Sequence, residues 1–136
     1  MKSSSFYRKY NGKVIEDCGA YVSPEFRTFA KDLKSVIKDI ANSINAQMVS
    51  FSVGHYFISA FVQKGEHYAY ISYDLSRMKN LDLQRTDPCE GFLVRAAKGP
   101  EDSTGLQNTF TNVYNLDSYI ESALRATCPV VSGTSA

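Results

Sequence analysis

The residues best suited to binding chemistry are arginines and small polar side chains near the ends of two expected strands. Arg77 and Arg85 follow one strand, and Arg95 lies near the end of the next. Guanidinium groups beside a rigid sheet can bind a phosphate backbone or an acidic protein patch through paired hydrogen bonds. The following segment supplies further candidates, which are Asp102, Thr104 and Asn108. An ion pair of Arg95 with Asp102 that only holds this segment in place is the simpler interpretation.

Aromatic residues crowd the central part of a chain that has nine tyrosines and eight phenylalanines. Rings on an open sheet can stack on unpaired bases, but rings at strand positions more often fill a core. We expect one sheet face to carry Phe57, Phe61, Tyr73, Ile71, Ser50, Ser52 and Ser59. If the last helix or the 74–90 segment covers that face, it is core. If it is uncovered, its mixed apolar and hydroxyl character suits a protein partner.

No known catalytic signature is recognisable, because the chain matches no P-loop, dinucleotide fingerprint, metalloprotease helix or nucleophile elbow. Cys18, Cys89 and Cys128 are an odd number of cysteines without the short intervals of a zinc site, so we interpret them as reduced thiols. Cys89 precedes an acidic residue, which is a poor setting for a catalytic thiol. We predict no catalytic residue, no metal and no cofactor.

Length and charge indicate one near-neutral domain. The chain has 136 residues, with 15 Lys and Arg against 14 Asp and Glu, so no global field attracts nucleic acid or a membrane. We expect a single α+β domain over residues 1–129 and a flexible tail over 130–136. The sequence has neither a run of about 20 apolar residues nor the apolar core of a signal peptide. We therefore expect a cytoplasmic protein without a membrane partner.

The clearest element is an amphipathic helix from Ser23 to Asn45. Ser23 suits the N-cap and Pro24 the first helical position. Apolar residues then recur every three or four positions, as a helix with one buried face requires. A second, shorter helix is expected after Asn115 and should end at Pro129.

The strands should form a meander that packs on the long helix. Alternation over 47–53, 56–63 and 67–73 predicts three antiparallel strands, the first two joined by Gly54 and His55. That turn would pair Phe51 with Ile58. A three-residue loop at 64–66 would place Tyr68 and Tyr70 on the same face as these two, whereas a two-residue loop would reverse the third strand. We favour three residues.

The remaining segments complete the predicted architecture. Asn11-Gly12 between Phe6–Tyr10 and Lys13–Glu16 predicts an N-terminal hairpin. Gly91–Ala97 predicts a further strand, and Lys98–Tyr114 a long polar loop of the kind that often carries function. The fold class is then α+β: an antiparallel sheet, made of the meander and the hairpin, on one long helix, with a short C-terminal helix.

Several short motifs resemble small accessory proteins of phages and integrative elements in Gram-positive bacteria. The matching residues are Gly54-His55-Tyr56-Phe57, Tyr70-Ile71-Ser72, Leu93-Val94-Arg95-Ala96-Ala97, Asp102-Ser103-Thr104-Gly105 and Asn108. The likeness covers about positions 47 to 110, and it departs at Leu106, where the pattern has a second glycine. Such proteins include anti-CRISPR inhibitors, so the resemblance implies an inhibitor of host defence.

Three functional hypotheses follow. The first is a non-catalytic inhibitor or adaptor from a mobile element that binds a host defence protein, such as a CRISPR effector, in the bacterial cytoplasm. The second is a single-stranded nucleic-acid binder that uses the sheet aromatics and the arginines. The third is a small hydrolase or transferase with a site around residues 98–110. Exposed edge strands are compatible with either a monomer or a homodimer.

Overall fold

A computed structural model describes residues 1–13, 24–54, 57–74, 88–100 and 107–126. These described residues form three helices and a five-stranded antiparallel sheet, so the fold class is α+β as predicted. The helices are α1 (Ser3–Tyr10), α2 (Pro24–Ser43) and α4 (Leu116–Ala126). The strands are β1 (Gln47–Val53), β2 (Phe57–Lys64), β3 (His67–Asp74), β4 (Phe92–Ala97) and β5 (Thr109–Thr111).

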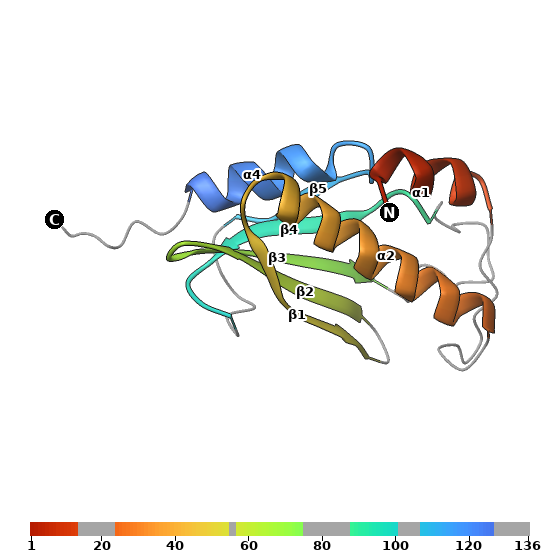
Figure 1. Cartoon of the computed structure of the whole chain (residues 1–136), viewed down its shortest axis with the longest axis horizontal. Helices are drawn as coiled ribbons and strands as arrows, with labels where there is room; N and C mark the ends of the chain where they lie inside the picture. The colour runs from red at the N-terminus through yellow and green to blue at the C-terminus, as the bar shows by residue number, and fades with distance from the viewer. Residues whose placement is uncertain (14–23, 55–56, 75–87, 101–106, 127–136) are drawn as a thin grey trace, which may run out of the picture.

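The sheet follows the order of the chain, β1-β2-β3-β4-β5, and the described helices all lie on one side of it (Figure 1). One continuous core joins Phe6 of α1, Phe29 of α2 and Ile120 of α4 to the strand residues beneath them, and all three are fully buried. The predicted packing of the long helix on the sheet is therefore confirmed. The last helix shares its side of the sheet and does not cover the opposite face.

Helix α2 begins and ends as its sequence predicts. Pro24 occupies the first helical position, where its missing N–H is not needed. At the other end Asn45 has a φ of 59°, and the amide of Ala46 bonds to the carbonyl oxygen of Ala41 at 2.8 Å. This is a Schellman motif, which satisfies carbonyls that the last turn leaves unpaired.

The predicted N-terminal hairpin is wrong, because residues 3–10 form α1. Phe6 and Tyr10 are four residues apart, so one helical face carries both rings onto Phe29 of α2, at centroid distances of 5.6 and 5.2 Å. A strand would instead align Arg8 with these two rings and press its charge toward the core. Gly12, with a φ of 76°, lies just beyond the helix instead of turning a hairpin.

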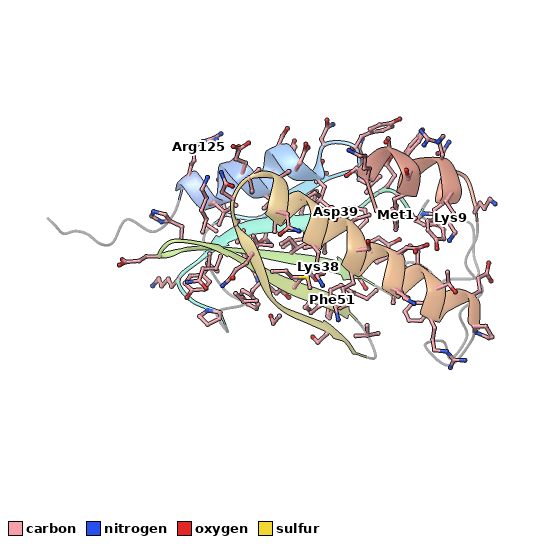
Figure 2. The ribbon with its side chains drawn as sticks, in the orientation of Figure 1. Met1, Lys9, Lys38, Asp39, Phe51 and Arg125 are labelled. Atoms are coloured by element: carbon pink, nitrogen blue, oxygen red, sulfur yellow. The ribbon has the colours of Figure 1, made fainter. Side chains whose placement is uncertain are left out.

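The β1–β2 hairpin is correct in its faces and wrong in its register. Gly54 pairs with Phe57 through a 2.8 Å bond, so Phe51 lies opposite Ala60 and not opposite Ile58. A displacement of two residues leaves each side chain on its face. An irregularity between Met48 and Ser50 then turns Met48 inward, where it joins Phe51 against the core. Figure 2 shows Phe51 beside α2.

The β2–β3 connection corrects the predicted loop. Lys64 pairs with His67, so the turn has two residues, and only its first residue, Gly65, has a positive φ (64°). That is the type II′ pattern, with glycine at the first central position. The third strand is consequently reversed from our expectation: Tyr73 faces the helices at 1% exposed, and Tyr70 faces away from them.

The expected long loop at 98–114 is interrupted by β5, which pairs with β4 through Thr109, Phe110 and Thr111. Strand β4 matches its prediction within one residue. Helix α4 begins directly after Asn115, as predicted, and Ile120 and Leu124 anchor it in the core. The predicted tail at 130–136 lies outside the described residues.

Candidate functional site

The candidate site is the face of the sheet that points away from α1, α2 and α4, here called the second face. Strand pairing places alternate residues of neighbouring strands in rows across it. Its described strand residues include Ser50, Ser52, Phe57, Ser59, Phe61, Gln63, Tyr68, Tyr70, Ser72, Asp74, Leu93, Arg95, Ala97 and Phe110. The face thus combines aromatic rings, hydroxyl groups and a guanidinium.

One row runs without a break from β1 to the residue before β5. Ser50 lies opposite Phe61, Phe61 opposite Tyr70, and Tyr70 opposite Arg95. The rings of Phe61 and Tyr70 are 5.0 Å apart, and the Arg95 guanidinium lies 4.8 Å from the Tyr70 ring centroid. Arg95 Nη1 donates to Asn108 Oδ1 at 2.6 Å. Stacking and this hydrogen bond together hold the guanidinium in one orientation.

Aromatic exposure on this face is greatest at its ends. Phe57 is 49% exposed and Phe110 is 59% exposed, which is unusual for phenylalanine. In the row of Arg95, further along the strands, Phe61 is only 8% exposed and its neighbour Tyr70 is half-buried. Exposed rings and a held arginine on rigid strands of one face resemble the aromatic and arginine anchors of protein interfaces.

The structure brings some predicted site residues together and separates others. Phe57, Phe61 and Arg95 lie on the second face, and Asn108 adjoins it. Tyr73 does not belong there, because the two-residue turn at Gly65 directs it into the core. The predicted site residues that lie outside the described ranges are Arg77, Arg85, Asp102 and Thr104. The suggested ion pair of Arg95 with Asp102 also involves a residue outside the described ranges. The same holds for residues 75–87, which belong to the segment considered as a cover for this face.

Two residues of this site were missed by sequence reasoning. Tyr70 was expected on the helix side, and Phe110 was expected in a loop. A two-residue turn that begins with glycine was already expected at Gly54, and Gly65-Glu66 fits the same pattern. Assigning a two-residue turn there would have placed Tyr70 on the second face. Strand β5 is only three residues long, so its alternation is too short to recognise.

A groove of about 680 Å³ lies between α4 and the edge of β4, and Arg95 is among the residues that line it. Its described lining includes Val94, Ala96 and Ala123 together with the hydroxyls of Ser118 and Ser122. It offers apolar contact and neutral hydrogen-bonding groups, near the region where a hydrolase or transferase site was considered. Residues 101–106 of that region lie outside the described residues.

The perturbed titratable groups lie elsewhere, where α1 meets α2. Asp32 Oδ2 accepts hydrogen bonds from Lys9 Nζ and from the Tyr10 hydroxyl, both at 2.7 Å. Burial opposes ionisation of Asp32, but these two donors outweigh it, so the pKa of this carboxyl lies below its ordinary value. Burial and the bond to Asp32 raise the pKa of the Tyr10 hydroxyl. This cluster joins the two helices.

A second polar contact between the N-terminus and α2 lies one to two turns further along α2, at Ser35 and Asp39. The amino group of Met1 bonds to Ser35 Oγ at 2.6 Å and pairs with Asp39 (Figure 2). The Asp32 and Asp39 carboxylates therefore face α1 along one side of α2. These contacts hold the fold together on the side opposite the second face.

Cys89 is fully buried in the core, which keeps its thiol from acting as an accessible nucleophile. Within the described residues, no group of three or more His, Cys, Asp or Glu side chains could hold a metal ion. No helix in the described part of the chain is long and apolar enough to cross a membrane.

No protein-family model, no curated protein and no solved structure matches this chain significantly.

Proposed function

We propose that this protein is a non-catalytic inhibitor or adaptor, of mobile-element origin, that binds a host defence protein such as a CRISPR effector in the bacterial cytoplasm. The class of partner comes from the sequence resemblance to accessory proteins of phages and integrative elements. The binding surface is the second face. Inhibition would be steric, because a rigid sheet can occupy a docking surface without doing chemistry.

The observation that carries this proposal is the pair of exposed phenylalanines on the second face. Phe57 and Phe110 project from strands, so little side-chain or backbone ordering is needed when a partner covers them. The described helices bury their apolar sides on the other face of the sheet, so none of these helices covers the second face. Aromatic residues in such positions are typical interface anchors.

The test is capture of purified CRISPR effectors, with their guide RNA, by the immobilised protein, followed by a DNA cleavage assay. We expect at least one effector to bind and to lose activity. The Phe57→Ser/Phe110→Ser variant should lose this binding, whereas Tyr119→Ser, an exposed ring on α4, should retain it. Failure to bind across a broad panel of effectors and other defence proteins would contradict the proposal.

A second candidate function is binding of single-stranded nucleic acid, and the stacked Tyr70–Arg95 pair favours it. An aromatic ring beside a guanidinium can accept an unpaired base. This candidate predicts a gel shift with single-stranded DNA or RNA that weakens steeply as salt rises. Absence of any shift at low salt would eliminate it.

Self-association is also part of the proposal. Strand β1 is at the edge of the described sheet, and an unpaired edge can pair with a second copy of the same strand. Light scattering after size-exclusion chromatography distinguishes the monomer from the homodimer.

A further inference from the structure

We propose that the open edge of β1 binds an extended acidic segment of another protein, which joins the sheet as an additional strand beside a row of cations on α2. This edge is distinct from the second face, so the inference goes beyond the proposed function and does not rest on it. The ligand is defined by its chemistry: a peptide strand with a carboxylate on every second residue.

The first argument is the direction of the main-chain groups of β1. The amide of Gly54 bonds to the carbonyl oxygen of Phe57 at 2.8 Å, which makes these two a hydrogen-bonded pair. Antiparallel pairs alternate, so Ser52 bonds to β2, whereas Phe51 and Val53 direct their N–H and C=O groups outward. β1 is the last strand of the described sheet, and it has no proline or charged residue that would block pairing. An extended peptide supplies both the donors and the acceptors that these groups need.

The second argument is a row of cations on the side of α2 next to this edge. Arg27, Lys34 and Lys38 are exposed, and their spacings of seven and four residues place them along one side of the helix. Lys34 Nζ lies 5.8 Å from the centroid of the Phe51 ring, and Figure 2 shows Lys38 and Phe51 on the same side of α2. Within the described residues none of the three cations forms an ion pair, because the aspartates of α2 face α1 instead.

The length of the row matches that of an added strand. Lys38 follows Arg27 by eleven positions, which is about 16 Å along a helix. Five residue steps along a strand cover about the same distance. Side chains of a strand alternate between the two faces, so acidic residues at every second position would all lie on the helix side, near the cations. One exposed ion pair contributes little, but several in register select an acidic ligand.

The same features argue against two other occupants of this edge. Two copies of the chain that continued one antiparallel sheet through β1 would place both α2 helices on the same side, with their rows of like charge toward each other. A nucleic-acid strand would be attracted to the cations, but its phosphates offer only acceptors. They would leave the outward C=O groups of Phe51 and Val53 without donors. An acidic peptide strand satisfies both the main chain and the charges.

The experiment uses two matched peptides, acetyl-Glu-Thr-Glu-Val-Glu-Thr-amide and the same peptide with glutamine at its three glutamate positions. We expect the glutamate peptide to bind about tenfold more tightly at low salt, as measured by calorimetry. Bound peptide should slow hydrogen exchange of the Phe51 and Val53 amides about tenfold or more, as measured by nuclear magnetic resonance. The Ser52 amide, which already bonds to β2, should change little.

A pair of charge reversals tests the cations. Lys38→Glu should remove most of the preference for the glutamate peptide, because it replaces a cation of the row with an anion. Lys13→Glu, which makes the same change at an exposed lysine beyond α1, should preserve the preference. The exchange measurement is made on the unaltered protein, so it does not depend on how a variant folds.

Equal affinity for the two peptides, including no detectable binding of either, would overturn the inference. Tighter binding of the glutamate peptide without slower exchange at Phe51 and Val53 would overturn it too, because no strand would then have been added. Slow exchange of both amides in the protein alone, with the mass of a dimer in light scattering, would overturn it in favour of a second copy. A ten-nucleotide thymidine strand that binds more tightly than the glutamate peptide would do so in favour of nucleic acid. The proposed function fails separately, when a captured partner binds the Phe57→Ser/Phe110→Ser variant as tightly as it binds the original protein.

Discussion

Removing the Asp32 carboxylate should loosen the attachment of α1 to α2. Asp32 accepts hydrogen bonds from Tyr10 and Lys9, and its side chain is only 17% exposed. A hydrogen bond to a charged group contributes about 1.5–3 kcal/mol. The Lys9 side chain is 46% exposed, so solvent screens its share to well below about 1 kcal/mol. We expect Asp32→Asn to lower the free energy of unfolding by about 2 kcal/mol, and Tyr10→Phe by about 1 kcal/mol.

The effect of Asp32→Asn should depend on pH in one direction. The pKa of Asp32 is lower in the folded protein than its ordinary value of 3.8, so the carboxylate stabilises the fold at pH values above 3.8. This contribution is lost as pH falls through the lower, folded-state pKa. The difference in unfolding free energy between the original protein and the Asp32→Asn variant should therefore shrink toward zero in acid.

Urea unfolding followed by circular dichroism, at about pH 7 and again at about pH 2, measures both quantities. Lys9→Met is the control, and it should cost less than about 0.5 kcal/mol. An Asp32→Asn variant as stable as the original protein at neutral pH would refute the reasoning. A loss of equal size at both pH values would show that the charge of Asp32 is not its source.

The remaining predictions concern the core, one turn and the second face. Ile120→Ala should cost about 2–5 kcal/mol in urea unfolding because Ile120 is fully buried, whereas Tyr119→Ala on the outside of α4 should cost far less. Gly65→Ala should lower the free energy of unfolding by about 1 kcal/mol or more, because Gly65 has a φ of 64°. Gly99→Ala should leave it nearly unchanged, because an added Cβ meets open space there. Equal losses for the two variants would contradict the type II′ turn. Phe57→Ser should change the unfolding free energy by less than about 0.5 kcal/mol yet weaken partner capture; a large loss of stability would instead assign the ring to the fold.

The long elements could be predicted from the sequence because their periodicity is unambiguous. Helix α2 repeats its apolar residues over five turns, and the side chains of the central strands alternate between the two faces of the sheet. The N-terminal segment could not be assigned in the same way, because Asn11-Gly12 fits both a hairpin turn and the end of a helix. Only the packing of Phe6 on Phe29 decides between them, and that contact joins distant parts of the chain.

The candidate site depended on a single residue of register. Arg95 was expected near the end of a strand and Asn108 in the long loop that follows it, and the two form a hydrogen bond. The identity of their aromatic neighbour was not predictable with the same ease, since a two-residue or a three-residue turn at Gly65 exchanges Tyr70 with Tyr73. A hydrophobic or aromatic residue on either face fits the alternation, so the pattern does not choose between the two turns.

The central claim is that partners bind the second face and not the helices. The most direct measurement is nuclear magnetic resonance of the isotope-labelled protein during titration with a captured partner. We predict that the amide signals of Phe57, Arg95 and Phe110 shift or broaden first, while those of Lys31 and Arg125 on the helices stay unchanged. Changes confined to α2 and α4, with the second face unaffected, would contradict the account.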